Sequence, residues 1–323
     1  MASTPSHDAS AQVGAPEASA QEIEIQGVVK RARTYDHIAT AVLWCIVAAI
    51  IVLLVATIGY VVISGLSKAI DPHFLTAKPE QFKEGGGIGP ELFNSFYLLV
   101  LTLLISLPIS LGGAIFLTQY APTGPVTSAA KTAIETLSSL PSIVVGLFGM
   151  LTFVLGMGWG FSILSGALTL TMFNIPILVR TIQQALEAVP RDQRDAALAL
   201  GLTRWEATVH ILVPRAMPAI VTGVILSAGR VFGEAAALIY TAGQSAPALN
   251  WAAPITNLAN PFNVMRPAET LAVHIWKINS EGVVPDLAAV SAGTAAVLMI
   301  CILIFNVVAR VVGRALERKM MAE

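Results

Sequence analysis

Two charged residues inside an apolar segment are the first candidates for chemistry in this chain. The segment extends from about residue 216 to residue 240, and its stretch "GRVFGEAAALIY" places Arg230 and Glu234 four positions apart. Residues four apart lie on the same face of a helix. A charged side chain within a membrane is costly, so it faces a bundle interior or a water-filled cavity. The pair predicts either a salt bridge that stabilises packing or a polar path across a membrane.

The path interpretation has a specific chemistry. The guanidinium of Arg230 presents a planar set of N–H donors that matches an oxyanion, and Glu234 would hold the arginine while no anion is bound. Arg180, at the inner end of another apolar segment, is the second candidate, either for attracting and releasing the anion or as an ordinary cytoplasmic anchor. The five histidines and two cysteines show no metal-binding spacing. We therefore expect no metal, no cofactor and no catalytic residue.

The composition indicates what kind of molecule must position these side chains. Of the 323 residues, 55% are hydrophobic and only 12% are charged, whereas a soluble domain has about 25% charged residues. A helix needs about 20 apolar residues to cross the hydrocarbon core of a membrane. We predict an all-α integral membrane protein with six transmembrane helices, the third and fourth joined as a tight hairpin near Trp159. The six stretches are residues 38–63, 92–118, 137–157, 160–179, 216–240 and 287–309, all with approximate ends.

The basic residues predict the orientation of these spans. If the N-terminus is cytoplasmic, most of the 19 Lys and Arg residues fall on the cytoplasmic side, as the positive-inside rule requires. Both termini are then cytoplasmic, and residues 64–91 and 241–286 form long outer loops. Residues 1–36 are predicted to be a disordered tail, because residues 1–27 contain no aromatic residue and cannot bury a core. Residues 314–323 form a short cytoplasmic tail.

Two other functions are not supported by the sequence. The glycine-rich "EGGGIGP", residues 84–90, lacks the GK[ST] ending of a nucleotide-binding P-loop. Any ATP hydrolysis that drives this protein would therefore occur on another polypeptide. The net charge of −1 gives no reason to expect nucleic acid as a partner.

The polar segment 180–215 lies between the fourth and fifth spans on the cytoplasmic side. Gly201 stands where a glycine would end a first helix in the left-handed conformation. Thr203 and Glu206 have the spacing of a capping box that begins a second helix, and Pro214 is expected to end it. The segment therefore predicts two short helices with a sharp corner at the membrane surface. Trp205 lies at this corner, where an exposed aromatic side chain is a plausible anchor for a partner protein.

The same corner resembles a known motif. The stretch "DAALALGLTRWEATVHILVP", residues 195–214, is similar to the EAA loop of ABC importer permeases, with Asp in place of the motif's Glu and Val213 in place of its Leu. In that family the loop docks in a groove of a cytoplasmic ATPase. The matching positions are Asp195, Ala196, Ala197, Gly201, Ile211 and Pro214, and the resemblance implies that they form the coupling loop together with Trp205.

Longer stretches narrow the resemblance to phosphate permeases of the PstA type. They include "SSLPSIVVGLFG" (138–149) and "GVILSAGRVFGEAAALIYTAG" (223–243), within a similar region that covers roughly residues 85–243. The resemblance implies a type I ABC importer permease domain over residues 92–313, preceded by a first transmembrane helix and outer loop over residues 37–91. It implies that the protein is not an enzyme but carries inorganic phosphate across the cytoplasmic membrane of a prokaryote. The implied partners are a second, related permease subunit, two ATPase subunits, an extracytoplasmic phosphate-binding protein and membrane lipid.

Three alternatives remain beside this interpretation. Within ABC permeases, the substrate could be another small oxyanion such as molybdate or sulfate. An ion-coupled secondary transporter would need inverted repeats and discontinuous helices, and no repeat is evident between the two halves of the chain. A structural or sensory membrane protein would not need the Arg230–Glu234 pair or the corner at Trp205.

Overall fold

The computed structural model describes residues 15–80, 82–245, 247–281 and 284–322, and within these ranges it contains helices and connecting segments but no strand. The chain divides into two compact units, residues 1–59 and 60–323, and each is described by itself. Five helices of the described chain are long and apolar enough to cross a membrane. A sixth span exists if one bent helix pair crosses as a unit. The predicted all-α membrane fold is confirmed.

The first unit is occupied by most of helix α1, Ala15–Ala69. Its apolar side chains from Ile38 to Val55 are exposed in the single chain, as is typical of a helix that contacts lipid. Residues 15–36 are helical, in contrast to the disordered tail that their composition predicted. They are rich in Ala, Glu and Gln, which favour helix, and no proline follows Pro16 there. The rest of that prediction falls on residues 1–14, outside the described residues.

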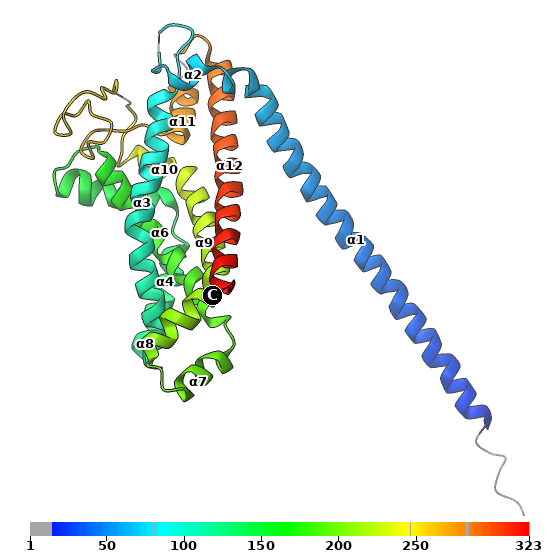
Figure 1. The fold of residues 1–323 in the computed structure, drawn as a ribbon. Coiled ribbons are helices and arrows are strands. Elements are labelled where there is room, and N and C mark those ends of the chain that lie inside the picture. The colour runs from blue at the N-terminus through cyan, green and yellow to red at the C-terminus, as the bar shows by residue number, and fades with distance from the viewer. Residues whose placement is uncertain (1–14, 81, 246, 282–283, 323) are drawn as a thin grey trace, which may run out of the picture. The chain divides into compact units, whose positions relative to one another are not determined.

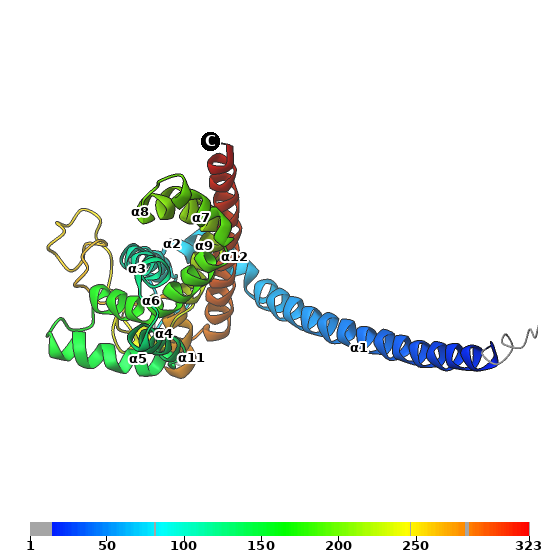
Figure 2. The ribbon, with the colours of Figure 1, turned by 90° about the horizontal axis from the view of Figure 1, so that it is seen from below.

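Within the second unit, three helices form a bundle (Figures 1 and 2): α3 (Gly89–Ile115), α6 (Ile163–Glu187) and α9 (Val213–Phe232). A fourth, α12 (Leu287–Ala322), packs along α9. Helix α6 is the most buried of the spans and packs against both α3 and α9. Its buried Asn174 donates to the hydroxyl of Ser106 on α3 at 3.0 Å and accepts from the hydroxyl of Ser227 on α9. A polar contact therefore fixes the register of all three helices.

The predicted third span is bent. Helix α3 continues as a π-helical turn, η1 (Phe116–Tyr120), and α4 (Pro125–Ser138) follows. Helix α5 (Ser142–Gly149) and the π-helical η2 (Met150–Gly156) then run at 99° to α4. Pro141 explains the break, because proline lacks an amide hydrogen and disfavours the helical conformation of the residue before it. The predicted third span, residues 137–157, therefore covers this break, and α4 to η2 forms the sixth span only if the bent pair crosses as one unit.

The loops predicted as outer contain short helices that contact the bundle. Residues 64–91 include α2 (Pro72–Thr76), and residues 241–286 include α11 (Leu271–Glu281). Helix α2 packs against α3, and α11 packs against both α3 and α12. Both loops are thus structured at the end of the bundle where α3 begins.

Candidate functional site

The predicted fifth span ends early, and this changes the geometry of the charged pair. Helix α9 ends at Phe232 with Gly233 as its cap, and the separate α10 covers Ala236–Ile239. Glu234 therefore lies outside the helix that carries Arg230. Among the described residues, no ion pair joins the two side chains. The prediction that they form one pair on a continuous helical face is wrong.

Glu234 has a local structural role instead. Its side chain is only 9% exposed, and its Oε1 accepts a hydrogen bond from the amide of Ala237 at 3.2 Å. This bond satisfies one of the amides that the start of α10 leaves without an intrahelical partner. Helix α10 packs closely on α5: a Cβ on Gly146 would lie 2.7 Å from the Cα of Ala237. Because α9 ends before Glu234, its carboxylate can reach α10. Glu234 thus supports this short helix.

Arg230 is exposed in the single chain and lies in the last turn of α9. Its guanidinium carbon is 4.2 Å from the ring centroid of Phe173 on α6, a cation–π contact. Leu226, one turn earlier on α9, is 63% exposed, so the arginine belongs to an uncovered and otherwise apolar face. Because an arginine facing lipid at this depth is costly, this face requires either water or another polypeptide against it.

The structure separates Arg180 from Arg230. Arg180 directly follows the predicted fourth apolar span, and α6 continues beyond it to Glu187. It is exposed, and its Nη2 lies 3.4 Å from Oε1 of Glu135 on α4. A second exposed pair, Lys131–Glu187 at 3.6 Å, joins the same two helices. Exposed pairs of this kind contribute little stability, but they give Arg180 a partner that Arg230 does not have.

The corner between the fourth and fifth spans has the predicted local structure. Helix α7 (Arg191–Ala199) ends in a Schellman motif: Gly201, at φ +87°, donates to Leu198, and Leu202 donates to Ala197. Helix α8 (Arg204–Ala207) then begins with the complete capping box of Thr203 and Glu206. Trp205 is 58% exposed and Leu200 is 83% exposed. The corner therefore presents two large apolar side chains on a rigidly defined turn.

Pro214 does not end the second helix, contrary to the prediction. Helix α8 continues through the π-helical turn η3 (Thr208–Leu212) directly into α9, whose first turn contains Pro214. Proline has no amide hydrogen to donate, and a π-helical turn gives the carbonyls that this leaves free other hydrogen-bond partners. The corner is thus continuous with the helix that carries Arg230. Of the other motif positions, Asp195 and Ala196 are exposed, Ala197 is buried, and Ile211 and Pro214 are half-buried.

A buried polar network at the start of α3 was missed by the sequence analysis. Arg266 is fully buried and donates to the side chain of Asn94 at 2.6 Å and to the carbonyls of Pro261 and Pro267. Burial lowers the pKa of Arg266 to about 10, so the guanidinium remains charged at neutral pH. Asn94 in turn donates to the carbonyl of Glu269 at 2.9 Å. One sequence signal could have indicated this network. The stretch "PELFNSF" places polar residues on one helical face at the start of an apolar span.

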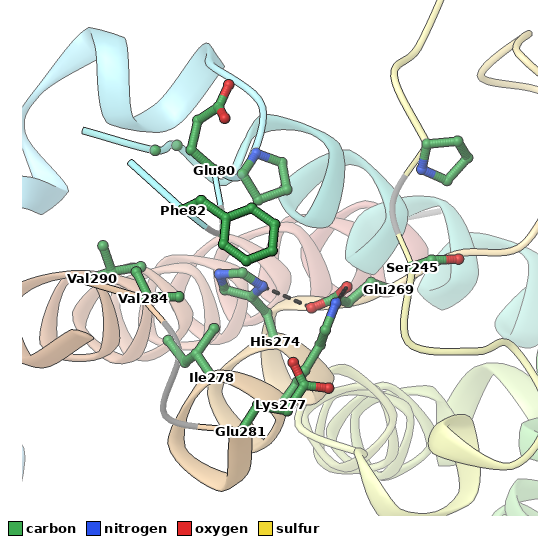
Figure 3. Close-up of a pocket in the computed structure, with 14 residues that line it drawn as sticks. Glu80, Phe82, Ser245, Glu269, His274, Lys277, Ile278, Glu281, Val284 and Val290 are labelled. Atoms are coloured by element: carbon green, nitrogen blue, oxygen red, sulfur yellow. Dashed lines mark hydrogen bonds and ion pairs between the residues drawn. The ribbon is translucent and has the colours of Figure 1, made fainter. Parts of the chain in front are cut away.

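A cavity of about 610 Å³ opens beside this network (Figure 3). Lys277 reaches the carbonyl of Gln244 at 2.7 Å and Oε2 of Glu269 at 3.2 Å. His274 contacts Oε1 of the same glutamate through Nδ1 at 2.7 Å. The lining also contains the carboxylates of Glu80 and Glu281. Because carboxylates outnumber the single lysine, this cavity does not suit an anion.

Comparisons with known proteins agree with the fold and with the resemblance to ABC importer permeases. Residues 110–322 match the family model described as binding-protein-dependent transport system inner membrane component. A probable ABC transporter permease protein, YqgI of Bacillus subtilis, is 47% identical over 89% of this chain and 98% of its own length. The phosphate transport system permease protein PstA 2 of Mycobacterium bovis is 31% identical over 71% of this chain and 76% of its own length. Among solved structures, a bacterial ABC transporter involved in the import of the acidic polysaccharide alginate has a TM-score of 0.54 at 16% identity, over 83% of this chain and 95% of that one.

Proposed function

Because the chain belongs to the family of binding-protein-dependent transport system inner membrane components, we propose that it is the permease through which inorganic phosphate enters the cytoplasm. It is a multi-pass ABC importer permease and not an enzyme. That its substrate is inorganic phosphate is our proposal. The observation that supports it is Arg230, an exposed guanidinium in the last turn of a candidate membrane span that has no carboxylate paired with it in the described chain.

Arg230 suits transient binding of an oxyanion. Its planar fork of donors matches two phosphate oxygens, and the Phe173 ring 4.2 Å away supports the guanidinium without neutralising it. A single arginine on an exposed helical face provides weak binding, which lets the anion leave again. In this proposal Arg230 carries the anion, and Glu234, which accepts from the amide of Ala237, supports α10. The ion pair with Glu135 favours the anchoring interpretation of Arg180.

The proposal includes the partners that complete the path. The uncovered face of α9 around Arg230 and Leu226 would be covered by a second, related permease, so that the anion passes between two chains. The corner with Trp205 and Leu200 would dock in a cytoplasmic ATPase, of which two copies are required for two permeases. An extracytoplasmic phosphate-binding protein would deliver the anion on the opposite side. Both termini are then cytoplasmic.

Transport by the reconstituted complex tests the substrate. Proteoliposomes containing the permease with its co-purified subunits and binding protein should show ATP-dependent uptake of labelled phosphate. An excess of unlabelled sulfate or molybdate should not compete. Uptake of sulfate or molybdate in place of phosphate would assign the chain to another oxyanion.

Variants of Arg230 test the path within the same assay. Arg230→Lys keeps the charge but loses the fork of donors, so we expect phosphate uptake to fall at least tenfold, equivalent to about 1.4 kcal/mol, with normal assembly. Arg180→Lys is the matched control and should retain most of the uptake. Wild-type uptake by Arg230→Lys and Arg230→Gln would mean that Arg230 is not on the path.

The orientation is tested by labelling. In a variant without Cys45 and Cys301, a cysteine at the exposed Lys78 should react with an impermeant reagent in intact cells. A cysteine at the exposed Arg191 should react only after the cells are opened. Both positions reacting from the same side would contradict the proposed topology.

A further inference from the structure

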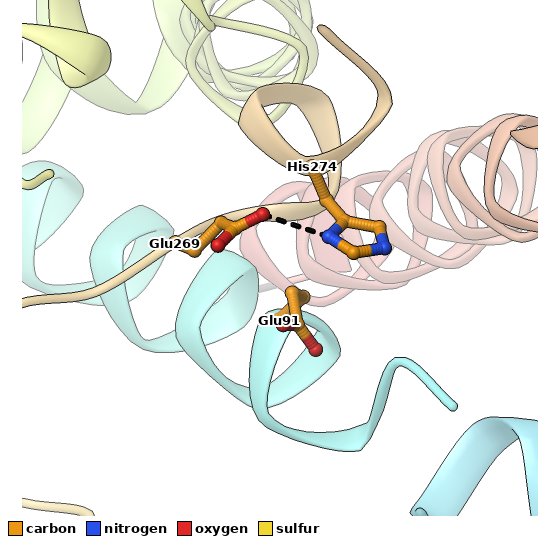
Figure 4. Close-up of side chains that lie close together, drawn as sticks. All are labelled: Glu91, Glu269 and His274. Atoms are coloured by element: carbon orange, nitrogen blue, oxygen red, sulfur yellow. Dashed lines mark hydrogen bonds and ion pairs between the residues drawn. The ribbon is translucent and has the colours of Figure 1, made fainter. Parts of the chain in front are cut away.

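We propose that Glu91, Glu269 and His274 form a binding site for one divalent transition-metal ion of the Zn²⁺ class, at the end of the bundle where α3 begins. The three side chains come from the first turn of α3, from the segment before α11 and from α11 itself (Figure 4). One potential ligand atom of each lies within 4.8 Å of the other two. Glu91 is far in sequence from Glu269 and His274, so no spacing pattern brings the three together.

The first observation is the state of Glu91. Its side chain is fully buried, and neither carboxylate oxygen has a hydrogen-bond partner among the described residues. A buried carboxylate without partners is strongly unfavourable. Lys277, the nearby cation, is engaged by Glu269 and by the carbonyl of Gln244. Glu91 therefore lacks a compensating group that a bound cation would provide.

The second observation is the state of His274. The side chain is buried, and its Nε2 has no hydrogen-bond partner in the part of the chain that the structure describes, while Nδ1 contacts Oε1 of Glu269 at 2.7 Å. A metal-binding histidine commonly uses one ring nitrogen for the ion and the other for a carboxylate that orients the ring. Nε2 can therefore bind an ion, whereas Glu269 becomes a ligand only by exchanging its contact with His274 or with Lys277 for one with the ion.

The donor set indicates the class of ion. One imidazole nitrogen with carboxylate oxygens suits Zn²⁺ and related transition metals more than Ca²⁺ or Mg²⁺, which prefer oxygen alone. Bond lengths of about 2.0–2.2 Å place the ligand atoms of a tetrahedral site about 3.3 Å apart. The ligand atoms here lie within 4.8 Å of one another, so the side chains must move together by roughly 1 Å or more when the ion binds. Glu269 and His274 also line the 610 Å³ cavity, which gives the ion a route of entry and space for a water ligand.

A bound ion would strengthen an existing attachment. The segment before α11 is already held to α3 by Asn94, which donates to the Glu269 carbonyl, and by Ser95, which accepts from the amide of Leu271 at 2.9 Å. An ion between Glu91 and His274 would join the same two elements through their side chains. We expect it to lower the mobility of this outer segment relative to the bundle.

Metal content of the purified complex tests the site. The complex, isolated with a tag that contains no histidine, is stripped with a chelator, reloaded with Zn²⁺ and desalted before the metal is measured. We expect about one ion per chain in the wild type. Glu91→Gln and His274→Gln should each weaken Zn²⁺ binding at least ~10-fold, as even the loss of outer-shell partners does. Glu281→Gln, which lines the same cavity outside the cluster, is the matched control and should bind like the wild type.

A measurement without variants covers the case in which Glu91→Gln does not fold. Co²⁺ loaded into the wild-type complex should give the intense visible absorption of a tetrahedral site, and Zn²⁺ should remove it. A wild-type complex that retains no ion would overturn the proposal. The buried negative charge of Glu91 would then be neutralised by a proton shared with Glu269. Binding by both variants equal to that of the wild type would overturn it as well.

Discussion

The corner around Trp205 and the polar network around Arg266 are stabilised in different ways. The corner is defined by hydrogen bonds between residues at most five apart: Gly201 and Leu202 to α7, and Thr203 with Glu206. The network joins residues that are more than 170 positions apart, as in the contact of Arg266 with Asn94. A short-range signal is present in any local window of sequence, whereas a long-range contact exists only after the chain has folded. The two regions should therefore respond differently to mutation.

The largest effect is expected from the long-range network. Arg266→Met leaves Asn94 and two proline carbonyls buried without their donor, and the loss of such a buried charged partner costs about 3–5 kcal/mol. We expect the complex to unfold at a clearly lower temperature in detergent, or to fail to assemble. Arg33→Met, at an exposed position, is the control. An unchanged unfolding temperature for Arg266→Met would show that the network does not hold the outer segment.

The next effect concerns binding rather than stability. Trp205→Ala removes an exposed aromatic anchor, and an interface hot spot of this type contributes about 2 kcal/mol or more. We expect a loss of ATPase subunits on purification, while the unfolding temperature of the permease itself stays as in the wild type. Leu104→Ala, also exposed but on α3, should leave ATPase binding intact. Full retention of the ATPase by Trp205→Ala would remove the coupling role of the corner.

Gly201→Val should have a smaller effect that combines stability and binding. A Cβ at Gly201 meets no atom within 4 Å, so the cost arises from φ +87° alone, about 1–2 kcal/mol. The corner should relax to another conformation and bind the ATPase less well. Gly124→Val is matched to it, because Gly124 is also in open space but has an extended backbone. Equal ATPase binding by the two variants would show that the left-handed turn is not required.

The smallest effect is expected for Thr203→Ala. The change removes the hydroxyl that accepts from the Glu206 amide at 3.2 Å and should destabilise the start of α8 by about 1 kcal/mol. Amide hydrogen exchange should increase over residues 204–207 and remain unchanged around Leu271. Increased exchange both at residues 204–207 and around Leu271 would mean that the corner and the Arg266 network are coupled. The two regions would then not respond independently to mutation.

Most elements of the fold could be predicted because their signals are local. Apolar stretches of sufficient length located the spans, and the capping residues located the corner to within a residue. The errors lie where backbone geometry depended on neighbours. Pro214 looks like a helix stop, but the π-helical turn before it keeps the helix continuous. Glu234 looks like the partner of Arg230, but the helix ends between them and the carboxylate caps α10.

The sequence by itself determined the membrane class, the approximate spans, the local structure of the corner and the presence of an arginine within an apolar segment. These follow from composition, hydrophobic length and hydrogen bonds within one turn of the chain. The tertiary structure alone decided that Arg230 lies over Phe173 with no ion pair among the described residues, that Arg180 pairs with Glu135, and that Glu91, Glu269 and His274 converge. Each of these depends on which side chains from distant segments come together. That is set by tertiary packing: α6 against α3, α4 and α9, and α11 against α3.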